Sequence, residues 1–253
     1  ELCEVGPRDG FQFEEKQIPT PKKLEIIEGL IEAGVRRLQA TSFVHPKWVP
    51  QMADAEELIR LLGVREDVVI SGLVLNLRGL ERTQRAGLTY VDISLATNEQ
   101  HSQDNANMSV AKGMEEGMAM VGRAVKSGMR PQIGFQTVFG YASPGDTPIE
   151  VVVDAVSRVD VMDADTVSFA DSTGMANPRM IRERLERLLE VVPVDKVVLH
   201  LHDTRGLGLA NVVAALECGV QRFDTSFGGM GGCPFVKGAS GNIATEDLVA
   251  MVE

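Results

Sequence analysis

Short apolar runs recur along the chain, and segments with helical spacing lie between them. Eight of these runs have the length of strands. Several of them lack polar alternation, which is typical of parallel strands covered on both faces. The predicted strands are Leu2–Gly6, Arg37–Ser42, Val68–Leu75, Tyr90–Ala96, Gln132–Val138, Thr166–Ser172, Val197–Asp203 and Arg222–Gly228.

The segments between the strands carry apolar residues three and four positions apart, the spacing of one helix face. Gly34 follows the first clear stripe, Pro178 precedes the second, and Gly219 follows the third, as expected for helix ends and starts. The stripes are Leu24 with Ile27, Leu30 and Ile31; Ile181 with Leu185, Leu188 and Leu189; and the segment from Leu209 to Leu216.

Eight strand–helix units in 253 residues predict an α/β fold, a (β/α)8 TIM barrel with its active site at the C-terminal ends of the strands. An open doubly wound sheet is the alternative, but it would place a glycine-rich phosphate loop after its first strand, and Gly6–Gly10 lacks that pattern. We expect residues 1–253 to form a single catalytic domain, truncated at its C-terminal end because the chain stops within the eighth helix. An upstream targeting segment stays an open alternative, since the chain begins at Glu1.

The composition and charge of the chain limit the classes of partner and the compartment that we expect. The chain is 44% hydrophobic with a net charge of −11, which argues against nucleic acid or an anionic membrane as a partner. No apolar run approaches the roughly 18 residues that a membrane helix needs. Three cysteines are too few for a disulfide framework and favour a reducing compartment. We therefore expect a cytoplasmic protein, with an organellar matrix as the alternative.

The most informative motif is His-Leu-His-Asp, residues His200–Asp203, at the end of the seventh predicted strand. Residues two apart on a strand share a face, so His200 and His202 can bind one metal ion. The other strand ends and the glycine-rich loop 228–242 add polar candidates. These are Arg8, Asp9, Gln39, Thr41, Ser42, Asp171, Ser172, Thr173, Asp203, Thr204, Cys233 and Asn242. A carboxylate with two imidazoles and an amide oxygen favours Mg²⁺ or Mn²⁺ over structural zinc.

Long motifs in this set resemble the hydroxymethylglutaryl-CoA lyase family of metal-dependent TIM-barrel lyases. They are Glu4–Gln12, Thr41–Met52, His200–Thr204, Gly231–Phe235 and Gly238–Asp247, in one order along nearly the whole chain. The resemblance implies cleavage of a 3-hydroxyacyl-CoA, such as 3-hydroxy-3-methylglutaryl-CoA, into acetyl-CoA and a keto acid. It also implies a bound divalent cation and a homodimer.

The resemblance assigns roles to individual residues. The implied metal ligands are Asp9, His200, His202 and Asn242. Arg8 is expected to bind substrate and to stabilise negative charge on the thioester oxygen. Asp171 is the candidate that handles the hydroxyl proton, Cys233 delivers a proton to the enolate carbon, and Thr173 contacts substrate.

Three positions depart from the family pattern on the catalytic rim. Gln39 replaces a catalytic-site glutamate, and the loops Gly140–Asp146 and Ala170–Gly174 replace Gly-Cys-Pro-Tyr-Glu-Gly and Gly-Asp-Thr-Ile-Gly. The pattern indicates retained chemistry on an altered substrate, and we expect Gln39→Glu to favour hydroxymethylglutaryl-CoA. The alternatives are a related lyase or carboligase acting on another, citramalyl-type 3-hydroxyacyl-CoA, and a barrel that only binds a CoA ester.

Overall fold

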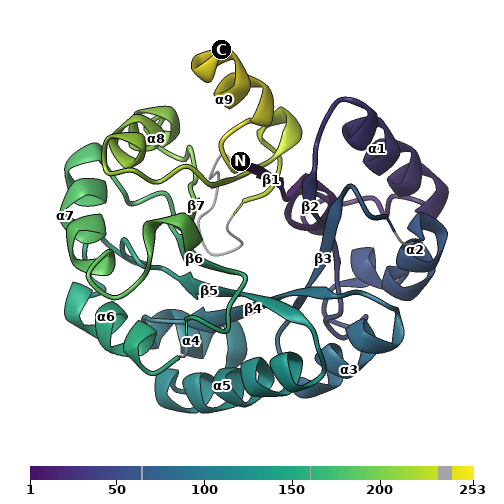
Figure 1. Ribbon diagram of the computed structural model, residues 1–253, viewed down its shortest axis with the longest axis horizontal. Coiled ribbons are helices and arrows are strands. Elements are labelled where there is room, and N and C mark those ends of the chain that lie inside the picture. The colour runs from purple at the N-terminus through teal and green to yellow at the C-terminus, as the bar shows by residue number, and fades with distance from the viewer. Residues whose placement is uncertain (64, 160, 233–240) are drawn as a thin grey trace.

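A closed barrel of eight parallel strands, paired in chain order, forms the centre of the computed structural model (Figure 1). The structure describes residues 1–63, 65–159, 161–232 and 241–253. The strands are β1 (Leu2–Glu4), β2 (Arg37–Ser42), β3 (Val69–Val74), β4 (Tyr90–Ala96), β5 (Arg130–Gln136), β6 (Thr166–Ala170), β7 (Val197–His200) and β8 (Phe223–Thr225). The predicted TIM barrel is confirmed.

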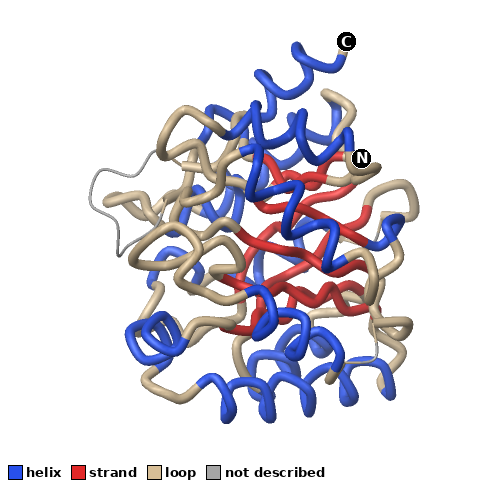
Figure 2. The backbone as a smooth tube through the Cα atoms, turned by 90° about the vertical axis from the view of Figure 1, so that its left-hand side faces the viewer, coloured by secondary structure: helices blue, strands red, loops and turns tan. Residues whose placement is uncertain are grey.

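Helices surround the strands as an outer ring, and Figure 2 shows the strands running through the interior. The helices are α1 (Thr20–Glu32), α2 (Ala55–Leu62), α3 (Leu77–Arg85), α4 (Glu99–Ala106), α5 (Val110–Lys126), α6 (Ile149–Ser157), α7 (Pro178–Leu188), α8 (Gly208–Glu217) and α9 (Thr245–Val252). Four single turns are η1 (Gly6–Gly10), η2 (Pro50–Met52), η3 (Val194–Lys196) and η4 (Phe227–Gly229). In the part of the chain that the structure describes, none of these helices combines the length and the hydropathy needed to cross a membrane.

The helix α7 shows how local sequence sets the element bounds. Asn177 caps the helix by accepting a hydrogen bond from the backbone N–H of Met180 at 3.0 Å, and Pro178 occupies the first turn. The stripe residues Ile181, Leu185 and Leu188 are fully buried against the barrel. The periodicity in the sequence therefore predicted both the helix and its buried face.

Several predicted strands are too long at their C-terminal ends. The first was expected to reach Gly6, but the chain enters the π-helical turn η1 there. The seventh was expected to reach Asp203, but β7 ends at His200, which lies opposite Ala170, the last residue of the neighbouring strand β6. Beyond that point His202 forms an isolated bridge with Asn242. The polar strand ends are thus loop residues that extend each strand toward a common opening.

Candidate active site

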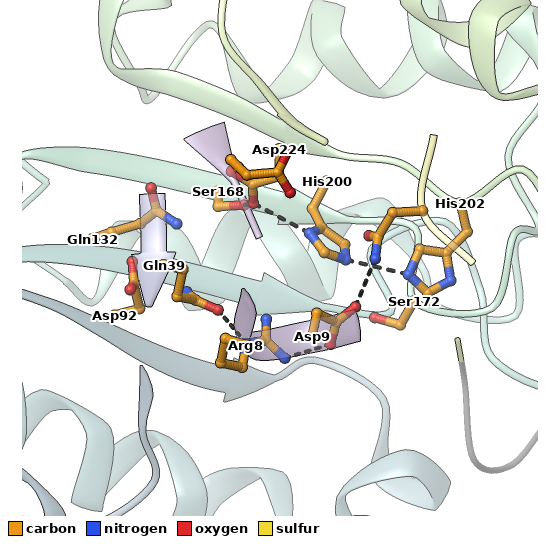
Figure 3. A network of polar contacts seen from close by, with 12 residues as sticks. Arg8, Asp9, Gln39, Asp92, Gln132, Ser168, Ser172, His200, His202 and Asp224 are labelled. Atoms are coloured by element: carbon orange, nitrogen blue, oxygen red, sulfur yellow. Dashed lines mark hydrogen bonds and ion pairs between the residues drawn. The ribbon is translucent and has the colours of Figure 1, made fainter. Parts of the chain in front are cut away.

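A cavity of about 510 Å³ lies at the C-terminal ends of the strands. Its lining includes six of the polar residues that the sequence analysis named: Arg8, Asp9, Gln39, Ser172, His200 and His202. Both histidines thus face the same cavity although only one belongs to β7. Figure 3 shows these side chains pointing toward one another across the barrel.

The turn η1 positions Arg8 and Asp9. Glu4, at the end of β1, is fully buried and accepts hydrogen bonds from the backbone N–H groups of Gly6 (2.7 Å) and Phe227 (3.1 Å). It thereby holds the start of η1 against the loop after β8. Single π-helical turns of this kind are frequent at functional sites.

Three ligand atoms for a metal ion converge in this cavity. Asp9, His200 and His202 each offer one atom, and these atoms lie within 4.8 Å of one another. The two Nε2 atoms of the histidines are 3.2 Å apart, and Nδ1 of His200 lies 3.2 Å from Oδ2 of Asp224 (Figure 3). Asp224 therefore orients the His200 ring so that Nε2 faces the site, the role that second partners play around metal-binding histidines.

The protonation states of these groups suit a cation. Burial alone would raise the pKa of Asp9, but Arg8, the two histidines and the hydrogen bond from Asn242 together hold it below its usual value. Burial, reinforced by neighbouring His200, lowers the pKa of His202 to about 3. An ionised carboxylate and a neutral imidazole are the forms that bind metal ions.

Asn242 offers a fourth possible ligand atom, its amide oxygen, beside this cluster. Its Nδ2 donates to Oδ2 of Asp9 at 2.7 Å and to the carbonyl oxygen of Met230 at 2.9 Å. Its Oδ1 is buried and has no hydrogen-bond partner among the described residues, and the same holds for Nδ1 of His202. A buried oxygen without a partner is costly. Rotation of the amide by half a turn would present it to an ion bound by Asp9, so the donor set fits a divalent cation.

A second line of polar contacts runs from Arg8 away from the histidines. The guanidinium donates from Nη1 to Asp9 and from Nε to Oε1 of Gln39. Beyond Gln39 lies the buried carboxylate of Asp92 (Figure 3), which accepts a hydrogen bond from the hydroxyl of Ser71 at 2.5 Å. Burial raises the pKa of Asp92, and the side chains of Ser71 and Gln39 oppose the rise. The neutral Gln39 thus separates Arg8 from Asp92.

Asp171 and Thr173 are not brought into the cavity. Ala170 and Ser172 line it, so the alternation along the chain turns their neighbour Asp171 outward. Its carboxylate accepts from the backbone N–H groups of Met175 (2.7 Å) and Ala176 (3.2 Å), and burial raises its pKa to about 6. This placement does not support the expected handling of the hydroxyl proton.

Thr173 is fully buried and donates to the carbonyl oxygen of Gly140 at 3.0 Å. It joins the loops after β5 and β6 and does not line the cavity. The predicted catalytic residue Cys233 lies outside the described residues.

Sequence reasoning missed several polar residues of the cavity wall. They are Asp92, Gln132, Gln136, Ser168 and Asp224, all within or at the end of strands. A signal was present at Asp92, because it interrupts the largely apolar run Tyr90–Ala96, whereas Asp224 lies among polar residues and gave no such signal. A buried carboxylate in such a run requires a partner, and that requirement indicates a functional position.

Comparisons with known proteins agree with this geometry. A family model described as HMGL-like matches residues 1–253. Hydroxymethylglutaryl-CoA lyase YngG of Bacillus subtilis (strain 168) is 38% identical over 252 residues, spanning 100% of this chain and 84% of that protein. The mitochondrial hydroxymethylglutaryl-CoA lyase of Rattus norvegicus is 37% identical over 253 residues, spanning 99% of this chain and 77% of that protein.

Solved structures of HMG-CoA lyases superpose closely on this chain. The crystal structure of the Bacillus subtilis HMG-CoA lyase superposes with a TM-score of 0.94, covering 99% of this chain and 84% of that one at 38% identity. An HMG-CoA lyase from Acinetobacter baumannii, in complex with coenzyme A and 3-methylmalate, superposes with a TM-score of 0.93 at 37% identity. The match covers 99% of this chain and 82% of that one. The full-length family match and these relatives show that the chain belongs to the HMGL-like family.

Proposed function

We propose that this protein is a carbon–carbon lyase that cleaves 3-hydroxy-3-methylglutaryl-CoA into acetyl-CoA and acetoacetate with a divalent cation, Mg²⁺ or Mn²⁺. The observation that carries the proposal is the convergence of Asp9, His200 and His202 in the cavity of a barrel whose curated relatives are named hydroxymethylglutaryl-CoA lyases. Residues 1–253 would act as one catalytic domain on an acyl-CoA substrate.

The reaction breaks the bond between C2 and C3 of the acyl group. The hydroxyl on C3 loses its proton and becomes a carbonyl, and the bonding electrons form the enolate of the acetyl thioester, which is then protonated at C2. When bound, the cation would lower the pKa of that hydroxyl, as it does for bound water. Asp9, His200, His202 and, after rotation of its amide, Asn242 would hold it.

Arg8 is the residue that we assign to the developing negative charge. Its guanidinium lies at the cavity wall with 12% of the side chain exposed, held by Asp9 on one side and Gln39 on the other. A fixed donor at the thioester oxygen stabilises the enolate without reorganising in the transition state. Protonation of the enolate carbon by Cys233 stays a prediction, as do the homodimer and the cytoplasmic location.

A second candidate is a lyase of the same chemistry acting on another 3-hydroxyacyl-CoA. The observation that favours it is the neutral partner of Arg8. Gln39 accepts a hydrogen bond from Arg8 but brings no negative charge to it, unlike the glutamate of the family pattern. The charge balance beside the thioester therefore differs from that of the family, and the accepted acyl group can differ with it.

Release of coenzyme A tests the proposal directly. The protein, freed of metal by a chelator, is assayed with 3-hydroxy-3-methylglutaryl-CoA and related 3-hydroxyacyl-CoA esters, with and without added Mg²⁺ or Mn²⁺. We expect release only with metal. His200→Ala should lose metal binding and turnover together, whereas Arg8→Gln should keep metal affinity within a few-fold and lose roughly 10²–10³ in kcat. Equal release without metal would refute metal dependence, and normal kcat in Arg8→Gln would remove Arg8 from the mechanism.

A further inference from the structure

The strand β5 presents a polar face to the cavity that the mechanism above does not use. Gln132, Gly134 and Gln136 alternate along the strand, and all three line the cavity. Gln132 pairs in register with Asp92 of β4, and Figure 3 shows both side chains on the side of the site away from His202. Two amides thus flank a position without a side chain.

Hydrogen bonds fix which end of the Gln132 amide faces the cavity. Arg37, which can only donate, lies with Nη2 3.5 Å from the hydroxyl oxygen of Thr166. The proton of that hydroxyl is then free to point at Gln132, where it donates to Oε1 at 2.7 Å. The Nε2 group of Gln132 must therefore point away from Thr166.

The Gln136 amide is oriented in the same way. The backbone N–H of Thr137 donates to the hydroxyl oxygen of Ser172 at 3.0 Å, and the Ser172 hydroxyl donates to Oε1 of Gln136 at 2.9 Å. Reversing the amide would leave the Ser172 proton without an acceptor. Nε2 of Gln136 is therefore turned from Ser172, and it would lie 4.0 Å from a Cβ atom placed on Gly134.

Both Nε2 groups are left as donors at the cavity wall. Among the described residues neither has a hydrogen-bond partner, although Gln132 is only 5% exposed. Both residues line the cavity, and a ligand oxygen that entered it would find two amide donors not engaged by the protein. The gap at Gly134 provides the space, because a Cβ there would meet nothing closer than the carbonyl oxygen of Ile93 at 3.7 Å.

The backbone next to Gln136 is strained. Thr137 has φ of 56°, in the left-handed region that β-branched residues rarely adopt. Such strain is concentrated at functional sites. Here it accompanies the N–H group of Thr137 that orients Ser172 and, through it, the Gln136 amide.

The charged side chains around Gln132 and Gln136 indicate which kind of ligand oxygen can bind beside them. Arg8 is the cation among the described residues that line the cavity, and it is already engaged by Asp9 and Gln39. The carboxylates of Asp92 and Asp224 line the same cavity, and the two glutamine amides carry no charge. An additional anionic group would be repelled here, whereas a hydroxyl or carbonyl oxygen would not.

We propose that Gln132, Gly134 and Gln136 form a specificity subsite that accepts an uncharged, oxygen-bearing substituent on C3 of the acyl group. The inference rests on the proposed lyase function and names the substrates that it prefers: 3-hydroxyacyl-CoA esters whose C3 substituent carries a hydroxyl or carbonyl oxygen, ahead of the ester with a plain methyl group. Gln132 and Gln136 donate to that oxygen, and the gap at Gly134 holds it.

Two esters that differ at this point alone test the subsite. One is 3-hydroxy-3-methylglutaryl-CoA, and the other carries a hydroxymethyl group in place of the methyl group. We expect the wild-type protein with Mg²⁺ to prefer the hydroxymethyl ester by about tenfold or more in kcat/KM, since one good hydrogen bond contributes about 0.5–1.5 kcal/mol and two donors are present. A ratio measured on one preparation is independent of the folded fraction.

Three variants distinguish a specific change in the subsite from a general disturbance of the fold. Gln136→Glu keeps an oxygen for Ser172 but replaces the NH₂ group by an anionic oxygen, so it should lower the preference about tenfold or more. Gly134→Ala adds a methyl group at ordinary contact distances and should also lower the preference. Gly122→Ala is the matched control, because a Cβ at this exposed position of α5 meets nothing within 4 Å, and it should leave the ratio unchanged.

Failure of the subsite and failure of the lyase function give different results. One outcome is that the wild type cleaves both esters with a ratio of kcat/KM values that neither Gln136→Glu nor Gly134→Ala changes. That result would overturn the subsite and leave the lyase function intact. If neither ester is cleaved, the lyase proposal fails, and calorimetric binding of the two esters to the wild type and Gln136→Glu decides the subsite. A wild-type preference that the variant loses supports the subsite; equal affinities, or no binding at all, overturn it.

Discussion

At the scale of single residues, the contact between Arg8 and Gln39 changes what a substitution in this site would do. Sequence reasoning alone expects Gln39→Glu to restore the family pattern. In the structure, however, Gln39 lies beside the buried carboxylate of Asp92 (Figure 3), where burial raises the pKa of Asp92 and Gln39 opposes the rise. A second carboxylate at position 39 would repel Asp92 in this buried setting.

We therefore predict that Gln39→Glu alone lowers both stability and kcat/KM, and that adding Asp92→Asn recovers most of both. The coupling between the two positions should be about 1–3 kcal/mol, because the two side chains are buried neighbours that would both carry a negative charge. Urea unfolding and steady-state kinetics on the four proteins of the double-mutant cycle measure it. Additive effects would show that Asp92 does not control the charge at position 39.

A second residue-scale prediction concerns His101, which is 6% exposed and packs its ring edge-on against Tyr141. Burial lowers its pKa, and Asp104 only partly opposes this. The unfolded chain, with a histidine pKa of about 6.5, therefore takes up a proton first as the pH falls. The free energy of unfolding therefore falls as the pH drops from about 6.5 to the lower pKa of the folded state. The loss is up to about 1.4 kcal/mol per pH unit.

His101→Gln should accordingly lose less stability than the wild type between pH 7.5 and pH 5.5. His45→Gln, in an exposed loop, is the matched control for the exchange of a histidine for a glutamine. Urea unfolding of the metal-free proteins at the two pH values gives the comparison. Parallel curves for His101→Gln and the wild type would contradict the prediction.

At the scale of elements, a buried ion pair fixes the α1 helix to the segment that forms one wall of the cavity. Lys23 of α1 is 1% exposed; its Nζ lies 2.6 Å from Oδ1 of Asp54 and also donates to the carbonyl oxygen of Gln51. Gln51 and the preceding Pro50 line the cavity. The helix therefore anchors the wall through charge as well as through its apolar stripe.

Lys23→Met should cost about 3–5 kcal/mol of unfolding free energy, because it leaves Asp54 without its cation in a nearly buried place. Its neighbour Lys22 is the internal control, because its ion pair with Glu25 is exposed. The Lys22 side chain is 55% exposed and the Glu25 side chain 67%. Lys22→Met should change stability by less than about 0.5 kcal/mol. Urea unfolding at pH 7 distinguishes the two, and equal small losses would refute the anchoring role.

At the scale of the whole molecule, closure of the barrel assembles the site from the two ends of the chain. The strand β1 pairs with β8, with Leu2 opposite Phe223 and Glu4 opposite Thr225. This pairing places Asp9, which follows β1, beside His200 of β7 and Asn242 of the segment after β8. A ligand held by these residues would join both ends of the chain in the folded state.

Binding of a divalent cation should therefore raise the thermal midpoint of the whole barrel. At a free Mg²⁺ or Mn²⁺ concentration of 100 times Kd the gain is about 2.7 kcal/mol, which corresponds to about 5–10 °C for a chain of this size. His200→Ala should abolish the shift, and Arg8→Gln should retain most of it. Scanning calorimetry of metal-free protein titrated with each cation measures the shift; an equal rise in His200→Ala would mean that the ion binds elsewhere.

The sequence by itself determined the barrel and the centre of the candidate site. Apolar runs and helical stripes report local burial, which every residue of a buried element shares, so their periodicity predicts elements such as α7 reliably. The pair His200 and His202 was recognisable because residues two apart on an extended chain share a face, and the bridge of His202 to Asn242 continues that extended course past β7. Asp9 was recognisable because it follows the first strand of a barrel, where functional groups gather.

Only the tertiary structure decided which neighbours of those residues take part. Asp171 and Thr173 turn away from the cavity because alternation past the end of β6 puts Ala170 and Ser172 on the inner side. The partners of Arg8 and His200, which are Gln39 and Asp224, lie 31 and 24 residues away along the chain. Contacts at that separation depend on strand register and barrel closure, which the local pattern of hydrophobic and polar residues does not encode.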